Sequence, residues 1–240
     1  MMGYSDQAQA RAEEAIELAT RLGAPFSMAY ALMYTIVLSH FRRDYSVIRS
    51  CAESLIQIAR EHGFPYWSAI ASMVIGRVLA GEGSHDAGII RMRDAMGTLR
   101  DTGGELVYCY ALSLLAESYL GAREPERGLE VVAEALKEIE ASGQQIHEAE
   151  VWRLRGELLL LHGNAVAEAE RSFMQALEAA RRQQARSWEL RAATSLARLL
   201  AARGRHDEAK STLAPILASI TEGFETADFK EGSGLLRQLS

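Results

Sequence analysis

Apolar residues recur at steps of three and four positions along almost the whole chain. Leu129, Val132, Ala133, Leu136 and Ile139 follow this spacing, which places them on one face of a helix. No stretch alternates apolar and polar residues as a half-buried β-strand does. The pattern predicts an all-α fold with helices at 5–22, 25–41, 44–62, 65–81, 84–101, 104–121, 125–142, 146–162, 165–184, 187–203, 206–221 and a weaker one at 226–239.

Proline and glycine mark the ends of these helices. Pro25 and Pro65 lie in predicted first turns, where a missing N–H costs nothing. Glycines recur forty residues apart at predicted C-terminal caps, at Gly23, Gly63, Gly103 and Gly143, and Gln183-Gln184 replaces the glycine in the fifth repeat. A fixed period in this range is typical of stacked helical units. We therefore predict a right-handed α-solenoid of about five to six helix-turn-helix repeats of 40–42 residues.

The repeats are expected to form a single helical-repeat domain over 1–240. It contains a half repeat at 5–22, full repeats at 25–62, 65–101, 104–142, 146–184 and 187–221, and a C-terminal helix at 226–239. Helix 5–22 aligns with the second helices of later repeats and lacks a first helix, which leaves its apolar stripe uncovered: Ala8, Ala12, Ala15, Ile16 and Ala19. Three interpretations stay open: the chain is part of a longer protein, its end contacts another copy, or an alanine face tolerates water.

Small residues repeat at two positions of each repeat. On the first helices they are Gly76, Ala116, Gly156 and Ala197, and on the second helices Gly88, Gly128, Ala169 and Ala209. Two helices approach closely only where side chains are short, so we predict that these residues meet within each repeat. The first full repeat has Ile36 and Ile48 instead and is expected to pack more loosely or to be rotated. This spacing resembles the tetratricopeptide repeat, although that repeat is shorter, at about 34 residues.

Three segments resemble the C-terminal end of a bacterial family of large signalling proteins. They are QARSWELRAATSLARL at 184–199, GRHDEA at 204–209 and TEGFETADFKE at 221–231. Members of that family carry a nucleotide-cyclase-like or DNA-binding domain, a regulatory ATPase of the signal-transduction type and a long helical-repeat tail. The resemblance implies a sensor or partner-binding tail. The sequence has no glycine-rich phosphate loop ending in Gly-Lys-Ser/Thr, so no ATPase or cyclase residue is assigned.

Charge and composition exclude several classes of partner. The net charge of −6 and the pI near 5.6 argue against nucleic-acid binding. The longest strongly apolar stretch, 29–38, is too short to cross a bilayer. Cys51 and Cys109 lie in apolar helical patterns, which favours a reducing compartment. We expect a soluble cytoplasmic protein without a membrane partner.

Catalytic and metal-binding patterns are missing from the sequence. The six histidines are dispersed, and no two have the spacing that places metal ligands on one helix face. Ser113 and Ser195 lie in mid-helix without a base nearby in sequence. We expect no enzyme activity, no metal site and no cofactor.

The candidate site is the concave surface, which the first helices line in a tetratricopeptide-like superhelix. The positions on the first helices that face the concave surface in that repeat correspond here to the candidate site residues Tyr30, Met33, Trp67, Ile70, Arg77, Tyr110, Glu117, His147, Glu150, Arg153, Glu157, Trp188, Arg191 and Arg198. Four charged residues occupy the same position in successive repeats and form a charge ladder: Arg77, Glu117, Glu157 and Arg198. They either form salt bridges with one another or recognise a partner. Trp67 and Trp188 either cover joints between repeats or bind a partner. Trp152 is assigned to packing.

These features favour a non-catalytic scaffold that binds a protein or peptide segment, or another domain of its parent chain, in the groove. The alternative function is a small-molecule sensor domain that receives an inducer. A second alternative is self-association through the N-terminal or the C-terminal helix.

Overall fold

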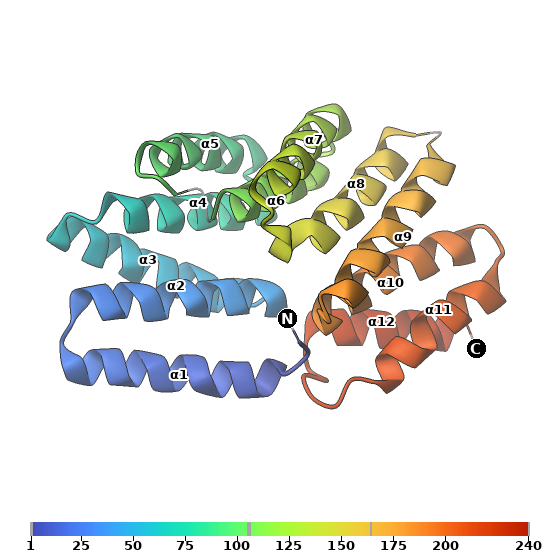
Figure 1. Ribbon diagram of the computed structural model, residues 1–240, viewed down its shortest axis with the longest axis horizontal. Coiled ribbons are helices and arrows are strands. Elements are labelled where there is room, and N and C mark those ends of the chain that lie inside the picture. The colour runs from blue at the N-terminus through green and yellow to red at the C-terminus, as the bar shows by residue number, and fades with distance from the viewer. Residues whose placement is uncertain (1, 105–106, 164, 240) are drawn as a thin grey trace. The chain divides into compact units, whose positions relative to one another are not determined.

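The computed structural model describes residues 2–104, 107–163 and 165–239. Within these ranges the chain forms twelve α-helices and no strand, and the 3-10 helix η2 (Gln145–His147) precedes the eighth α-helix (Figure 1). The helices are α1 (Ser5–Leu22), α2 (Pro25–Arg42), α3 (Tyr45–His62), α4 (Pro65–Gly81), α5 (His85–Asp101), α6 (Tyr108–Ala122), α7 (Pro125–Ser142), α8 (Glu148–His162), α9 (Val166–Arg182), α10 (Arg186–Ala202), α11 (His206–Ala218) and α12 (Ala227–Gln238).

Most predicted helix bounds agree with the structure to within two residues. The predicted helix at 104–121 includes 105–106, which lie outside the described residues, and α6 begins at Tyr108. The predicted helix at 146–162 starts with the tighter turn of η2 before α8. The prediction of 206–221 was too long: α11 contains Pro215 and ends at Ala218, after which the N–H groups of Ser219 and Ile220 donate to carbonyls three residues back.

The glycine period is visible in the backbone. Gly63 and Gly143 end α3 and α7 in the left-handed conformation, with φ of 67° and 71°, and the Gly143 N–H donates to the Ile139 carbonyl at 2.9 Å. In the fifth repeat the left-handed residue is Gln184, at φ 52°. The left-handed backbone conformation after the second helix is therefore retained in the fifth repeat, although glutamine replaces glycine there.

Contacts divide the chain into two compact units. The N-terminal unit comprises residues 6–122, and the C-terminal unit comprises residues 123–240 together with 1–5. In the N-terminal unit α2, α3, α4, α5 and α6 pack in sequence order, and the first helix α4 also contacts the first helices on either side of it, α2 and α6 (Figure 1). The C-terminal unit repeats this arrangement from α7 to α12. Such nearest-neighbour packing defines a helical-repeat solenoid.

Close helix crossings occur at predicted small residues in the second and fourth full repeats, whereas Gly128 of α7 lies against Leu158 of α8, in the next repeat. A Cβ on Gly76 would lie 2.7 Å from the Gly88 carbonyl oxygen, so α4 and α5 touch through their backbones. Gly156 of α8 accommodates the ring of Phe173 from α9. Ile36 and Ile48 are both fully buried in the first full repeat. Larger side chains therefore occupy the interior there, where later repeats use glycine or alanine.

Candidate functional site

Helix α2 is predominantly apolar and is incompletely covered. From Pro25 to Ser39 it contains no Asp, Glu, Lys, Arg or His. Phe26, Tyr30 and Tyr34 are nevertheless 54%, 44% and 61% exposed. Predominantly apolar helices are normally buried, so this face is unusual.

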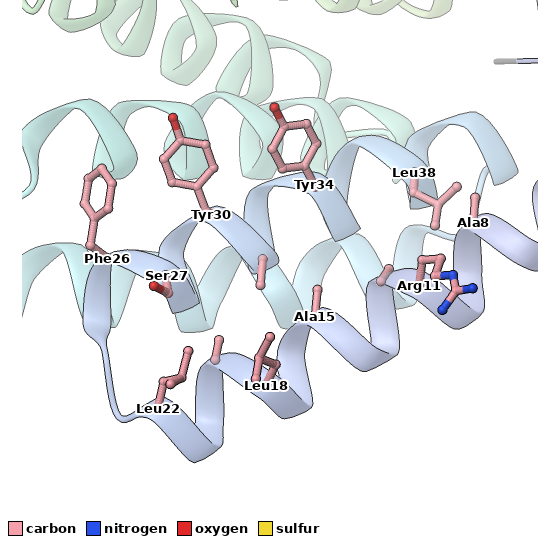
Figure 2. A pocket seen from close by; sticks show the side chains of 13 residues that line it. Ala8, Arg11, Ala15, Leu18, Leu22, Phe26, Ser27, Tyr30, Tyr34 and Leu38 are labelled. Atoms are coloured by element: carbon pink, nitrogen blue, oxygen red, sulfur yellow. The ribbon is translucent and has the colours of Figure 1, made fainter.

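Helix α1 presents a second apolar face toward α2. Figure 2 shows Ala15, Leu18 and Leu22 of α1 projecting toward α2, and Leu18 and Leu22 remain half exposed or more. In this fully described helix only Ala19 is buried. Four residues of the stripe predicted to lack cover, Ala8, Ala12, Ala15 and Ala19, line the space between α1 and α2, whereas Ile16 does not.

An apolar groove separates the two helices and has a volume of about 660 Å³ (Figure 2). Its walls, all within the described range 2–104, contain one charged side chain, Arg11, whose Nη1 lies 2.6 Å from Glu14 Oε2. We call it the α1–α2 groove, lined by Ala8, Arg11, Ala12, Ala15, Leu18, Ala19, Leu22, Phe26, Ser27, Tyr30, Ala31, Tyr34 and Leu38.

Aromatic packing holds the α2 wall in place. The Tyr30 ring lies 4.9 Å, edge to face, from the buried ring of Trp67 on α4, and Phe26 lies 5.9 Å from the same ring. Tyr34 stacks on Tyr30 at 6.1 Å. Trp67 therefore covers the joint between the first two full repeats, and the exposed rings rest on this support.

The predicted charge ladder of the N-terminal unit is satisfied internally. Arg77 forms two contacts with Glu117, at 2.9 Å from Nε and 2.7 Å from Nη2, and donates to the Tyr45 hydroxyl at 3.2 Å. His40 Nε2 lies 3.4 Å from Glu117 Oε2. Burial raises the pKa of Glu117. The positive charge of Arg77 and the hydrogen bonds from His40 and Arg77 lower this pKa by more than burial raises it, so it lies well below its ordinary value of 4.5. The ladder consists here of salt bridges.

The C-terminal unit has a related network on α8, α10 and α12. Arg153 pairs with Glu150 at 2.7 Å, and Arg191 lies 3.5 Å from the same carboxylate and 2.6 Å from Asp228. Ser195 donates to Glu157 at 2.6 Å, and Arg198 Nη1 lies 3.9 Å from that carboxylate.

Most of the sequence-predicted site residues lie inside the protein. Met33, Trp67, Ile70, Arg77, Tyr110, His147, Glu150, Arg153, Trp188 and Arg191 are buried, whereas Glu117 and Glu157 are partly exposed and Tyr30 and Arg198 are exposed. Trp188 packs under Arg191, 5.0 Å from its guanidinium carbon, and Trp152 packs against the core of its unit. Only Tyr30 lines the α1–α2 groove. A binding role for the others stays a prediction.

Sequence reasoning missed Phe26, Tyr34 and Leu38. Together with Tyr30 they recur every four residues in a segment without charges, and this spacing was the available signal. Their exposure depends on the position of α1, which the sequence does not encode locally.

The described residues contain neither a cluster of metal-binding side chains nor a helix that could cross a membrane. Within the described ranges, no three His, Cys, Asp or Glu side chains are grouped to hold a metal ion. No helix in those ranges combines the length and the apolar character that crossing a bilayer demands. Cys51 and Cys109 are buried and form no disulfide, and burial raises the pKa of the Cys51 thiol.

No family model and no curated protein matches the sequence. Solved structures match the fold. BtubC from P. vanneervenii is 18% identical with a TM-score of 0.61, covering 89% of both chains. NprR, solved with its cognate peptide NprX, is 15% identical with a TM-score of 0.69 over 97% of this chain and 65% of NprR. The apo form of RapI is 9% identical with a TM-score of 0.57 over 92% of both chains.

These likenesses define the class of the fold. NprR and RapI are tetratricopeptide-like helical-repeat proteins, and this chain shares their all-α repeat architecture. At identities below 20% the likeness concerns the fold alone.

Proposed function

We propose that this chain is a non-catalytic interaction scaffold that holds an amphipathic helix of a protein partner in the α1–α2 groove. We also propose that it is the cytoplasmic C-terminal tail of a larger bacterial signalling ATPase or cyclase-like protein. The observation that carries the binding proposal is the exposed ridge of Phe26, Tyr30 and Tyr34 in a segment of α2 that has no charged residue. Exposed aromatic patches of this kind are typical of interaction sites.

The geometry of the walls favours a helical partner. Both walls are helices, whose backbone N–H and C=O groups already bond within each helix, so strand addition has no template. The ridge from Phe26 to Leu38 spans twelve residue steps, about 18 Å along a helix axis. A partner helix of about twelve residues therefore matches its length, with apolar anchors at three- and four-residue steps.

The chemistry of the groove favours a peptide over a small molecule. Its volume of about 660 Å³ lies within the usual range for small-molecule sites. Such sites, however, need convergent polar groups to fix orientation, and this lining offers only Ser27, the tyrosine hydroxyls and Arg11, which pairs with Glu14. The NprR structure with its cognate peptide supports peptide binding by this fold class.

A substitution pair tests the proposal. Segments of 12–20 residues are selected from a displayed library of amphipathic sequences, and their affinities are measured by calorimetry. We expect Phe26→Ser with Tyr34→Ser to weaken binding at least tenfold, about 1.4 kcal/mol. The control is Ile90→Ser, an equally exposed apolar residue on α5 outside the groove. Equal losses in both variants, or no selected segment, would contradict the proposal.

A further inference from the structure

The α1 wall of the α1–α2 groove corresponds to a face that α5 buries. Two periods of forty residues relate four alanines of this wall to four residues of α5: Ala8 to Gly88, Ala12 to Met92, Ala15 to Ala95 and Ala19 to Leu99. All four α5 residues are buried, and a Cβ on Gly88 would lie 2.8 Å from the backbone nitrogen of Ala80 on α4. This face of a second helix therefore packs against the first helix of its own repeat.

The α2 wall corresponds to a face that α4 buries. One period of forty residues relates five residues of this wall to five buried residues of α4: Ser27 to Trp67, Tyr30 to Ile70, Ala31 to Ala71, Tyr34 to Val74 and Leu38 to Val78. The Trp67 ring lies 4.9 Å from Tyr30, so this face of α4 is turned toward the preceding first helix, α2. Both walls of the groove are thus faces that a first helix covers in the later repeat.

The α4–α5 pair fixes the direction of such a helix. Gly76, in the C-terminal half of α4, lies against Gly88 near the N-terminal end of α5, so the two helices run antiparallel. A helix held in the same way on α1 places its C-terminal half beside Ala8 and its N-terminal half beside Ala19.

Side-chain sizes are complementary where first and second helices cross. A Cβ on Gly76 would lie 2.6 Å from Met92 Cγ, so the small residue makes room for the large one. The register of the repeats gives four such pairs: Gly76–Met92, Gly156–Phe173, Ala197–Leu213 and Ile36–Ala52. In the last pair the sizes are reversed, and both Ile36 and Ala52 are fully buried. Close packing accepts either order, provided that one partner is small.

We propose that the α1–α2 groove takes a helix of a partner protein in the place of a first helix, antiparallel to α1, and that Ala12 selects a large aliphatic side chain at the crossing. Both the pose and the selection rest on the binding function proposed above. Ala12 has the position of Met92 but the size of Ala52, which is paired with Ile36. A partner helix with a small residue at this point would leave a cavity against Ala12, whereas isoleucine would fill it.

The test uses a labelled peptide with the sequence of residues 24–43 and lysines added at both ends, because this segment is a first helix with Ile36 at the crossing. We expect wild-type protein to bind it at least tenfold more tightly than the peptide carrying Ile36→Ala, and the protein variant Ala12→Phe to reverse this preference. The matched control is Ala10→Phe, an exposed position of α1 outside the groove lining, which should keep the wild-type preference.

The outcomes separate this proposal from the proposed function. An equal preference in wild type and Ala12→Phe would overturn the selection by Ala12. If segments selected from the displayed library bind and the peptide of residues 24–43 does not, the first-helix pose is wrong while the binding function stands. If neither binds, the binding function itself fails.

A measurement on the wild type tests the pose if Ala12→Phe does not fold. A paramagnetic label at the C-terminal end of the bound peptide should broaden the methyl signal of Ala8 more than that of Ala19. The opposite order would overturn the antiparallel pose. A dimer of the chain alone with the groove covered would overturn the proposal too, because a second copy would then be the occupant.

Discussion

The α4–α5 crossing has no space for a methyl group at Gly88. A Cβ there would lie 2.8 Å from the Ala80 backbone nitrogen, an atom that cannot move without moving α4. We expect Gly88→Ala to lower the free energy of unfolding by about 2–3 kcal/mol. Gly97 on the same helix meets nothing within 4 Å, so Gly97→Ala should raise it by about 0.5–1 kcal/mol. Urea denaturation measures both, and two changes of the same sign would contradict the role of the crossing.

The Arg77–Glu117 pair makes stability depend on pH. Glu117→Gln leaves Arg77 buried opposite a neutral amide, and we expect a loss of about 2–3 kcal/mol at pH 7. Because the folded-state pKa of Glu117 lies well below its usual 4.5, the wild type has this stability above that value and loses it as the pH falls through the folded pKa. The difference between variant and wild type should therefore shrink in acid.

The exposed Arg49–Glu82 pair is the control for this pH dependence. Its two side chains are 36% and 56% exposed, so Glu82→Gln should change stability little at any pH. Denaturation curves from about pH 7 downward compare the two variants. A Glu117→Gln deficit that stays constant in acid would show that packing, rather than charge, sets its cost.

Among the elements, α1 should be the least protected helix of the N-terminal unit. It buries only Ala19, whereas α4 buries eleven residues. Local opening requires the loss of few contacts there, so we expect its amides to exchange at least tenfold faster than those of α4. A segment bound in the α1–α2 groove should slow exchange in α1 and leave α5 unchanged. Uniform slowing across the unit would contradict binding at this site.

The helices could be predicted from the sequence because their signals are local. Prolines at first turns, glycines at caps and apolar residues at three- and four-residue steps each act within a few positions. The end of α11 was predicted three residues too late, and Pro215 does not mark it, because the helix continues past Pro215 to Ala218. The close crossing at Gly76 and Gly88 was also predictable, because small residues recur at a fixed spacing in the sequence where two helices approach closely.

At the scale of the whole molecule, the site could be predicted only in part. Arg77 and Glu117 were recognised as a ladder, but they pair across forty residues of sequence, and a single chain does not reveal that their charges are already used. Conversely, Tyr34 was missed because its exposure depends on how far α1 stands from α2, which is a tertiary property. Long-range pairing and burial, rather than helix formation, limited the prediction.

The overall charge leads to a final prediction about binding kinetics. The chain carries a net charge of −6, whereas the α1–α2 groove holds one charged side chain, which is paired. Attraction between the negatively charged chain and a segment with basic flanks should therefore raise the association rate. Apolar contacts in the groove should determine the dissociation rate. Between about 0.02 and 0.5 M salt we expect the association rate to fall about tenfold and the dissociation rate to stay constant, as stopped-flow fluorescence would show. A dissociation rate that rises steeply with salt would instead place charge pairs inside the bound interface, contrary to an occupant with an apolar contact face.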